Sequence, residues 1–593
     1  MMKLIVHITL VLAVFLTGLR MAGQVRITSE EELELLKATP LETIYLHSNA
    51  TLFFPGEYLY YSLYTINTQT YRLSNISKVA YVQLVGENGT VVFTQKVSLD
   101  RGKGQGDYFF PTDLPSGNYK LIGFTHWMKN AGLSQFFMSD LTFLNPYRSD
   151  QGVFLNAGGE DSACASGIPE GNHSKESFQG AELGLELQDS TLSPGTATRV
   201  SLRNYKGALG NGTYSLSVRK VDEFSHAGRI AATEYSSRYP NLQQTLPQQV
   251  NDILAIPEQR GELLSGQVFE KDSKTPLKGR MLALSLPGED FQIKKALTDF
   301  EGKFYTYVTK PFLGQNGIVE LLPPGRMPAT FEWSSTTTWE GDIPCFYRFN
   351  LEPELAEVIR ERSVHNQIEN SYFEVKPDTL QPREATDPFE GETPIVYKLE
   401  DYTRFPTLRE TIVEILEHVW VRRGDDDADD IMVYLPGESA STQNDPKRAM
   451  VVADGILVPD HAAFLEYDAR KIQTIRIIRQ KYQLGGTEYK GVLVVETLEG
   501  QFGANWESEY GTPFPYLPPA PRKDYFHQGK PSAHVPDFRY QLLWEPRIEL
   551  EGPSKSFTFY TSQVPGRYEV VLEGFTTYGK PISMKTYFEV EEE

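Results

Sequence analysis

The sequence predicts a mainly β fold, built from tandem Ig-like β-sandwiches with one small α/β domain. Three observations lead to this prediction. Apolar and polar residues alternate with the period of two that is typical of half-buried strands. Turn-forming residues, among 47 Gly and 37 Pro, separate many short stretches of this kind, and only one segment has a strong helical pattern. With 593 residues, the chain is long enough for four or five domains of about 100 to 150 residues.

Residues 1–23 have the pattern of a secretory signal peptide, with one lysine, an apolar run from Leu4 to Leu16, and small residues at Ala22 and Gly23. We therefore expect an exported protein. No later segment approaches 18 consecutive apolar residues, so we expect no transmembrane segment in the mature chain. The 57 basic and 78 acidic residues give a net charge of −21, which repels phosphate backbones and argues against a nucleic-acid partner.

A first sandwich is predicted over residues 24–147. The pair Asn88-Gly89 can adopt the positive φ angles of a tight turn, and alternating stretches lie on both sides of it. Residues 148–180 are polar and rich in Gly and Ser, which predicts a linker.

Alternation resumes after this linker and predicts a second sandwich over residues 181–259 and a third over residues 260–350. Residues 351–395 carry charges and several prolines with little periodicity. We interpret them as a connector.

The segment 396–505 combines helix and strand. Thr407 and Glu410 have the spacing of a capping box, which predicts a helix over residues 405–423. Its expected apolar stripe consists of Leu408, Ile412, Ile415, Leu416 and Val419.

Short strands follow this helix, with turns predicted at Asp454-Gly455, at Gly485-Gly486 and at Gly491. Alternation then continues over residues 506–593, which predicts a final sandwich.

The first predicted sandwich resembles the macroglobulin-type domains of the α2-macroglobulin superfamily. The residues that carry this resemblance are Pro55-Gly56-Glu57, the Gly117-Asn118-Tyr119 turn and Trp127. Residues 181–259 look like a second domain of that type. The resemblance implies a macroglobulin-like β-sandwich in both places.

The third predicted sandwich resembles a carboxypeptidase regulatory-like domain, through Gly266, Pro276-Leu277, Thr298-Asp299 and the run from Gly302 to Phe304. Residues 396–505 resemble the plug domain of TonB-dependent receptors, with Asp454, Gly455, Gly485, Gly486 and Gly491 in its turns. This order of domains is similar to that of multidomain envelope proteins of Bacteroidota. The resemblance implies a protein of the periplasm or outer membrane, with the cell surface also open.

A true TonB-dependent receptor closes a barrel of many strands of about 10 residues each, and the residues after Gly500 are too few and alternate like a soluble sandwich. The chain is therefore not expected to be a transporter by itself.

No catalytic or cofactor-binding residues are predicted. Neither cysteine lies in a Cys-Gly-Glu-Gln-like run, which covalent protease trapping would need. The His173 and Glu176 pair, which has zinc-ligand spacing, lies in the predicted linker, where a rigid site would be hard to hold. We expect a non-enzymatic protein without a cofactor.

Two groups of residues remain as site candidates. The acidic cluster of Asp425, Asp426, Asp427, Asp429 and Asp430 has the hard oxygen ligands that Ca²⁺ prefers, but it lacks the spacing of an EF-hand loop and is more typical of a solvated loop. Cys164 and Cys345, the only two cysteines, could form one disulfide in an oxidising compartment or could stay unpaired.

The expected function is that of an adaptor or scaffold that binds a protein partner at the outer membrane or in the periplasm. Two alternatives stay open: an accessory of a TonB-dependent uptake system that holds a glycan or peptide ligand, and a macroglobulin-like protease inhibitor. An exposed aromatic cluster in a concave groove would favour the ligand-binding accessory. A flat apolar patch would favour the adaptor.

Overall fold

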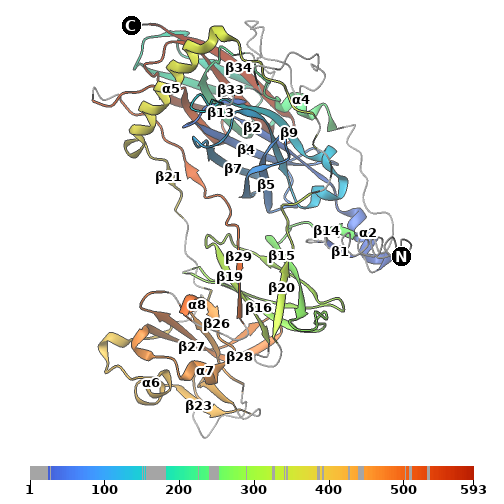
Figure 1. The fold of residues 1–593 in the computed structure, drawn as a ribbon, viewed down its shortest axis with the longest axis vertical. Helices are drawn as coiled ribbons and strands as arrows, with labels where there is room; N and C mark the ends of the chain where they lie inside the picture. The colour runs from blue at the N-terminus through green and yellow to red at the C-terminus, as the bar shows by residue number, and fades with distance from the viewer. Residues whose placement is uncertain are drawn as a thin grey trace, which may run out of the picture. The chain divides into compact units, whose positions relative to one another are not determined.

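The computed structural model describes residues 24–26, 29–149, 151, 154, 182–224, 226–239, 253–288, 290–322, 328–339, 341, 343, 345–382, 388–389, 393–424, 428–438, 447–500, 502–505, 511–530 and 534–592. The chain divides into two compact units, which are described one at a time (Figure 1). The larger unit comprises Gln24–Gln259, Thr337–Pro382 and Pro519–Glu593, and the smaller unit contains Arg260–Thr336 and Arg383–Pro518. The predicted signal peptide, residues 1–23, lies outside the described residues.

The first sandwich of the larger unit pairs a three-stranded sheet with a five-stranded sheet. The three-stranded sheet has the order β2 (Glu42–Ser48), β4 (Tyr58–Asn67) and β7 (Lys103–Phe109). The five-stranded sheet has the order β3 (Leu52–Phe53), β9 (Phe137–Phe143), β8 (Gly117–Phe124), β5 (Val79–Gly86) and β6 (Val91–Ser98). The predicted turn joins β5 to β6, with Gly89 at a φ of 78°. Trp127 is fully buried, and its Nε1 donates to the carbonyl of Pro40. The predicted first sandwich is therefore present.

The second sandwich of the larger unit is built from two distant parts of the sequence. Its strands, again in sheet order, are β10 (Leu183–Leu187), β12 (Ala197–Asn204) and β32 (Ser554–Tyr560), and β11 (Thr191–Leu192), β34 (Pro581–Val590), β33 (Gly566–Thr576), β13 (Gly212–Lys220) and β31 (Gln541–Leu550). The prediction of two separate sandwiches over residues 181–259 and 506–593 is therefore wrong. The first segment has too few strands to cover an apolar core, and β31 to β34 complete it.

Strands β2 and β4 are buried on both faces, because the second sandwich covers the face that does not pack on the five-stranded sheet. Tyr64 of β4 donates to Ser215 of β13 at 3.0 Å, and Nδ1 of His47 lies 2.6 Å from the same hydroxyl. This double burial explains why these strands are almost continuously apolar and aromatic instead of alternating.

The rest of the larger unit consists of helices and short strand pairs. They are α2 (Glu30–Ala38), α4 (Ala232–Ser236), α5 (Ala356–Ser371), β1 (Gln24–Arg26) paired with β14 (Ile253–Ala255), and β21 (Thr379–Leu380) paired with β30 (Lys523–Asp524). The predicted connector over residues 351–395 thus contains the 16-residue helix α5. Most of the predicted linker, namely residues 150, 152–153 and 155–180, lies outside the described residues.

The smaller unit contains a sandwich of three and four strands. In sheet order they are β18 (Lys303–Val308), β15 (Glu262–Glu270) and β20 (Ala329–Trp333), and β17 (Gln292–Leu297), β16 (Met281–Leu286), β19 (Asn316–Leu322) and β29 (Gly511–Pro515). The sandwich predicted over residues 260–350 therefore ends earlier, at Trp333. It gains β29 from the segment that had been assigned to the last sandwich.

An α/β domain forms the rest of the smaller unit. Its five-stranded sheet has the order β22 (Ile395–Lys398), β27 (Ile472–Leu484), β28 (Thr487–Thr497), β25 (Met450–Ala453) and β26 (Ile456–Leu457). The domain also contains a hairpin of β23 (Val419–Arg423) and β24 (Asp429–Val433) and the helices α6 (Leu408–Glu414), α7 (His461–Leu465) and α8 (Phe502–Asn505). Ile412, Phe464 and Leu493 lie in one buried core.

The predicted helix is present but shorter than expected. The Thr407 side chain accepts a hydrogen bond from the Glu410 backbone, as the capping box requires. The helix α6 ends at Glu414, and His418 adopts a φ of 69°. Val419, assigned to the helical stripe, instead begins β23, because pairing with β24 suits β-branched residues better than another helical turn.

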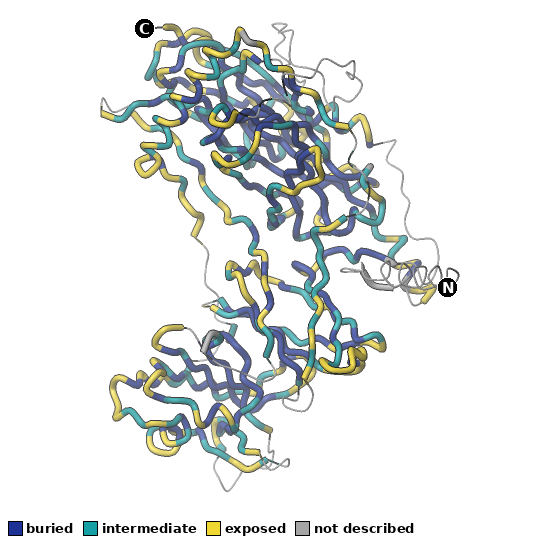
Figure 2. Tube along the Cα trace, in the orientation of Figure 1, coloured by how far each residue is buried: buried dark blue, intermediate teal, exposed yellow. Residues whose placement is uncertain are grey.

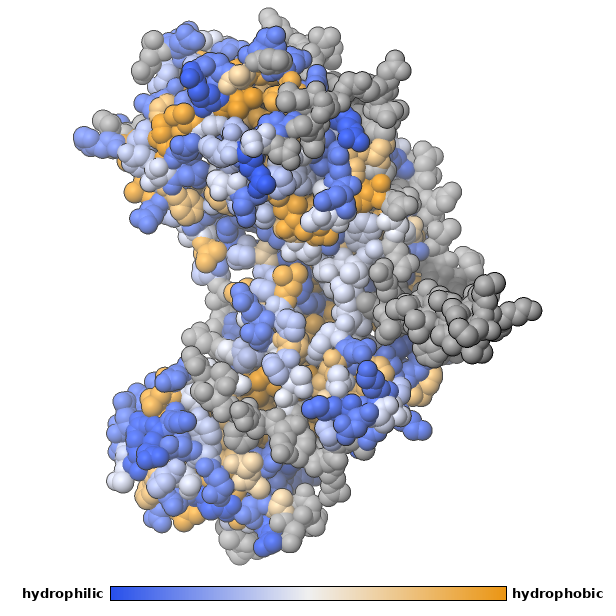
Figure 3. Space-filling model, viewed as in Figure 1, coloured by the Kyte–Doolittle hydropathy of each residue, from blue (hydrophilic) through white to orange (hydrophobic). Residues whose placement is uncertain are grey.

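The predicted fold class is confirmed: the chain is mainly β, with several sandwiches and one small α/β domain. Buried residues concentrate in the sheets of each unit (Figure 2). Hydrophobic residues on the visible surface form separate patches among hydrophilic ones (Figure 3). In the described part of the chain, no helix combines the length and apolarity needed to cross a bilayer.

Candidate functional site

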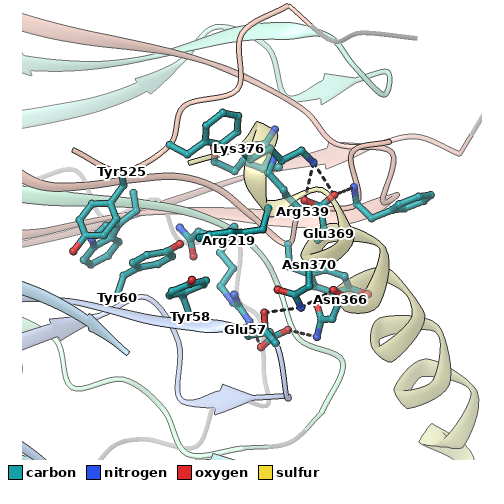
Figure 4. A pocket seen from close by; sticks show the side chains of 18 of the residues that line it. Glu57, Tyr58, Tyr60, Arg219, Asn366, Glu369, Asn370, Lys376, Tyr525 and Arg539 are labelled. Atoms are coloured by element: carbon teal, nitrogen blue, oxygen red, sulfur yellow. Dashed lines mark hydrogen bonds and ion pairs between the residues drawn. The ribbon is translucent and has the colours of Figure 1, made fainter. Parts of the chain in front are cut away.

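The larger unit contains a hollow of about 150 Å³, which we call the aromatic hollow. It is lined by the start of β4, by Arg219 of β13, by helix α5 and the turn after it, by Tyr525 and Phe526, and by residues 538–544. Figure 4 shows Arg219 between the tyrosine rings on one side and helix α5 on the other.

Aromatic rings form one wall of the hollow. Tyr58 and Tyr60 are two residues apart on β4 and therefore point to the same side of the strand. Their rings are nearly parallel, with centroids 5.6 Å apart and an interplanar angle of 9°. The Trp544 ring continues the row at 6.1 Å from Tyr60, and Tyr525 meets Tyr60 edge-on at 4.9 Å.

The Tyr58 hydroxyl is protonated at neutral pH. Burial, together with the nearby charges of Asp107 and Asp378, raises the pKa of Tyr58 to about 12. Its ring is half-buried. Tyr58 therefore offers an apolar face and a neutral hydroxyl at the edge of the hollow.

Charged side chains on the opposite wall are held by one another. Lys376 lies 2.7 Å from a carboxylate oxygen of Glu369 and donates to the Pro536 carbonyl at 3.0 Å. Arg539 donates to both carboxylate oxygens of Asp537, at 2.6 and 2.8 Å. These pairs fix the turn after α5 and the approach to β31.

Arg219 lies inside the hollow and is only 4% exposed. Among the described residues its guanidinium makes one hydrogen bond, from Nη2 to Glu57 at 3.4 Å, and its Nε has no acceptor there. The Nε1 of Trp544, which is 2% exposed, also lacks an acceptor in the described part of the chain. A buried donor without a partner costs about 1–3 kcal/mol, so these groups need an explanation.

Helix α5 is fixed to the hollow by Arg362, which is 1% exposed. Its guanidinium donates to both oxygens of Glu57, at 2.7 and 2.9 Å, and to Asp222 at 2.5 Å. Burial acts to raise the pKa of Glu57, but the charges of Arg362 and Arg219 outweigh it and lower this pKa. Glu57 is therefore ionised at neutral pH.

The backbone of Gly56 lies close to the same helix. Its φ of 85° is unfavourable for other residues, and an added Cβ would lie 2.2 Å from Nδ2 of Asn370. That amide donates to the Gly56 carbonyl at 3.2 Å. The Pro55-Gly56-Glu57 run, which carried the macroglobulin resemblance, is thus the place where α5 contacts the first sandwich.

No family model matches the chain, and no curated protein does. Solved structures align with it at low similarity. The α2-macroglobulin of Salmonella reacted with methylamine aligns over 94% of this chain and 40% of its own, with 12% identity and a TM-score of 0.23. The Escherichia coli α2-macroglobulin activated by porcine elastase aligns over 93% and 44%, with 11% identity and a TM-score of 0.22.

The Escherichia coli adhesin FdeC aligns over 47% of this chain and 58% of its own, with 10% identity and a TM-score of 0.14. The chain thus spans about two fifths of the length of the macroglobulins. TM-scores of this size do not establish a shared arrangement, so the fold rests on the strands and sheets described above. The macroglobulin-type, regulatory-like and plug-like resemblances stay predictions.

Two of the three predicted turns of the α/β domain are present. Asp454 and Gly455 have φ angles of 45° and 82° between β25 and β26, and Gly485 and Gly486 have 51° and 80° between β27 and β28. The turn predicted at Gly491 is wrong, because Gly491 lies within β28; its φ of 81° belongs to an irregularity in the pairing with β27, between Ile478 and Lys481. The positive φ angles of these residues shape the backbone of the domain.

Two of these positions are also fixed by close contacts. The Asp454 carboxylate accepts from the backbone of Thr497 and of Phe502, at 2.8 and 2.9 Å. A Cβ at Gly491 would lie 2.4 Å from Cβ of Val433. Asp454 therefore holds the end of β28 and the start of α8, and the absence of a side chain at Gly491 lets β28 pack closely on Val433.

The acidic cluster is only partly within the described residues, because Asp425, Asp426 and Asp427 lie outside them. Asp429 pairs with Arg409 at 2.9 Å, and Asp430 lies 3.3 Å from His461 and 3.6 Å from Arg448. Across the described ranges, no group of three or more His, Cys, Asp or Glu side chains could hold a metal ion. Both described carboxylates therefore act as partners of basic side chains.

Cys345 is disulfide-bonded. The surrounding segment is held on the first sandwich, because Lys120 donates to the Cys345 carbonyl at 3.0 Å and pairs with Asp140 at 2.6 Å. Cys164, like His173 and Glu176, lies outside the described residues, so its pairing with Cys345 stays a prediction.

Sequence reasoning did not predict the aromatic hollow. The alternation of Tyr58 and Tyr60 was a visible signal, since the two rings had to share one side of a strand. Arg219, Arg362 and Trp544 gave no such signal. They come from segments that are far apart in the sequence and meet only in the folded unit.

Proposed function

We propose that this chain is an exported, non-enzymatic binding protein of the bacterial envelope, and that its aromatic hollow holds a small ligand, either a sugar or a short peptide. The observation that carries the proposal is the concave row of rings formed by Tyr58, Tyr60 and Trp544 around Arg219. Small-ligand sites are usually concave and aromatic, with a few placed polar groups. A concave aromatic site favours the ligand-binding alternative over the adaptor.

Binding without catalysis agrees with the state of two of the three carboxylates that line the hollow. Glu57 is ionised and bonded twice by Arg362, and Glu369 is bonded by Lys376. A general acid or base needs a pKa near the working pH and a free path to the substrate. These carboxylates are better suited to hold the walls of the hollow.

Export is supported by the signal-like residues 1–23 and by the bonded state of Cys345, since disulfides persist mainly in oxidising compartments. The same two features and the resemblance to envelope proteins support our proposal of a location in the periplasm or at the outer membrane, with the cell surface also open.

A binding screen with the full-length mature chain tests the proposal. Thermal unfolding is measured with neutral oligosaccharides, uronic-acid oligosaccharides and tetrapeptides, and a ligand at about 100 times its Kd should stabilise the fold by about 2.7 kcal/mol. Tyr58→Ala should weaken this effect. Tyr205→Ala, which changes an exposed tyrosine of the same unit that does not line the hollow, should preserve it. If no compound stabilises the wild type, or if Tyr58→Ala responds equally, the proposal is refuted.

The adaptor role is a second candidate, favoured by the α/β domain. This domain has its own buried core around Ile412, Phe464 and Leu493. Pull-down with the full chain from detergent-solubilised outer membrane tests it, and recovery of the bait alone would count against it. A protease inhibitor would instead retain and block an added protease after being cleaved.

A further inference from the structure

We infer that the ligand of the aromatic hollow is an uncharged sugar, with one ring seated against Tyr58 and Tyr60. This inference rests on the proposed binding function and names the class of ligand. It follows from the charge balance, the ring surfaces, the available hydrogen-bond donors and the size of the hollow.

The charges that line the hollow are balanced. Three acidic and three basic side chains face it, namely Glu57, Glu369, Asp378, Arg219, Lys376 and Arg539. Lys376 and Arg539 are already paired with carboxylates, at 2.7 and 2.6 Å. Recognition of a carboxylate or phosphate group needs a cation with charge to spare, usually presented as a fork. The balance therefore favours a neutral ligand.

The ring wall suits the face of a sugar. Aromatic faces carry partial negative charge, and the C–H groups on one face of a pyranose carry partial positive charge, so the two surfaces attract each other. Tyr58 and Tyr60 are almost parallel and stacked, with ring centroids 5.6 Å apart, and Trp544 extends the stack beyond Tyr60. A saturated sugar ring can pack its C–H groups against the ring that ends this stack.

Arg219 supplies the polar contact that fixes a sugar. Its charge is balanced by Glu57, yet its guanidinium makes only the one 3.4 Å hydrogen bond among the described residues. A guanidinium has five N–H donors, so unused donors remain for hydroxyl oxygens. Hydroxyl groups accept hydrogen bonds without adding charge. They therefore suit an arginine whose charge is already balanced and whose N–H donors are not all used.

An extended peptide lacks the strand edge that it would need. Peptides bind sheets through main-chain hydrogen bonds to a free edge. Strand β4 is the middle strand of its sheet. Strand β31 is an edge strand, but the carbonyls of Leu542 and Leu543 accept from Arg539 at 3.0 Å and from Gln541 at 2.7 Å. Side chains of the protein itself therefore occupy these acceptors.

The size of the hollow fits one ring. A protein cavity of about 150 Å³ is enough to hold a six-membered ring such as benzene. The hollow has this volume and is open on one side, so that further sugar units of a chain can extend into solvent.

Isothermal titration calorimetry on the full-length mature chain tests the inference. The neutral probes are cellotetraose, maltotetraose, laminaritetraose, mannotetraose and xylotetraose, the acidic probe is tetragalacturonic acid, and the peptide probe is tetra-alanine. We expect at least one neutral probe to bind with one site per chain. Its Kd should not change between 50 and 500 mM NaCl, because screening acts on charged pairs.

Three variants locate the bound sugar. Tyr58→Ala should weaken binding about two- to tenfold, the range of a lost aromatic contact, whereas Tyr58→Phe should keep the affinity. Arg219→Lys keeps the charge but loses the fork of donors, so it should also weaken binding. The matched control Tyr205→Ala should bind like the wild type.

The possible outcomes distinguish a failure of the sugar inference from a failure of the proposed binding function. If only the acidic probe or the peptide binds, and Tyr58→Ala weakens it, the sugar inference is overturned while the binding function stands. If a neutral sugar binds but all three hollow variants bind it like the wild type, the sugar inference is overturned together with the hollow as the binding site. If none of the probes binds, both fail.

Discussion

Replacing Arg362 by Met should release helix α5 from the aromatic hollow. Arg362 is the only member of α5 that donates to both Glu57 and Asp222 among the described residues, and its guanidinium also lies 4.3 Å from the Phe54 ring centroid and 5.1 Å from that of Tyr540. Methionine keeps part of the apolar stem but no charge. Of the two arginines beside Glu57 and Asp222, Arg219 alone would then remain. His226 would still lie 3.7 Å from Asp222, and the Asn366 amide 3.3 Å from Glu57.

The expected cost is large because the cluster is buried. Removing one partner of a buried ion pair costs about 3–5 kcal/mol, since the remaining charge is left uncompensated. This is a large share of the 5–15 kcal/mol that stabilises a typical domain. Arg360→Met is the matched control on the same helix. Its pair with Glu357 is 2.5 Å long but more than 70% exposed on both sides, so we expect a change within about 0.5 kcal/mol.

Hydrogen–deuterium exchange read by mass spectrometry is the most direct assay, because peptides from α5 and β4 report on the larger unit separately from the smaller one. Arg362→Met should speed exchange in α5 and lower the thermal midpoint of the larger unit, whereas Arg360→Met should do neither. Equal protection of α5 in both variants would refute the reasoning, because the buried cluster would then not hold the helix.

Three further predictions concern other parts of the chain. Burial raises the pKa of Glu573 from 4.5 to about 7, so the folded state binds more protons than the unfolded state between these pH values. The free energy of unfolding should therefore fall by up to about 3 kcal/mol as the pH rises through this range. Glu573→Gln should remove this pH dependence in urea unfolding at pH 5 and pH 8, and an unchanged pH dependence would contradict the assignment. Gly491→Ala should destabilise the smaller unit by about 3 kcal/mol, because the backbone has a positive φ there and the new Cβ would lie 2.4 Å from Cβ of Val433. Gly486→Ala, which also has a positive φ but open space around it, should cost about 1 kcal/mol in the same urea unfolding assay. Equal effects of the two variants would exclude the clash. Non-reducing peptide mapping should find Cys164 joined to Cys345, and a free thiol at Cys164 would disprove that pairing.

Local features were predicted well from the sequence. The turn at Asp454-Gly455 follows from two adjacent residues that accept positive φ, and the cap at Thr407 follows from residues three positions apart. Such signals need no knowledge of distant partners. The presence of strands was also readable, since the alternation that marks Tyr214, Leu216 and Val218 as one strand face is local.

Strand partners could not be predicted in the same way. Strand β13 lies between β31 and β33, which come from the last part of the chain, and nothing in the local alternation names these neighbours. One sandwich was therefore counted as two. The same limit hid the aromatic hollow, whose residues Tyr58, Arg219 and Trp544 belong to three such distant strands.

Helix α5 was missed for a different reason. Its buried residues are Arg362, Ser363 and Asn366, so the face that packs inward is polar and gives little hydrophobic period. Prediction from apolar stripes assumes that a helix docks by burying apolar surface. Here only Val358 and Ile359 of the helix pack, partly buried, on an apolar cluster, and the fully buried contact is the ion cluster of Arg362. The position of Glu57 in the folded unit makes this buried arginine favourable.

Because that cluster is also a wall of the hollow, ligand binding and helix docking should be thermodynamically coupled. Glu57 is held by Arg362 from α5 and by Arg219 from β13, and Arg219 is the residue that we expect to meet the sugar. A ligand that binds only the docked state stabilises it by mass action. By the same linkage, a variant that undocks α5 must lose affinity even though Arg362 itself does not line the hollow. The hollow is thus a property of the assembled larger unit, in which a helix held by a buried ion cluster completes a site that no single sandwich could form.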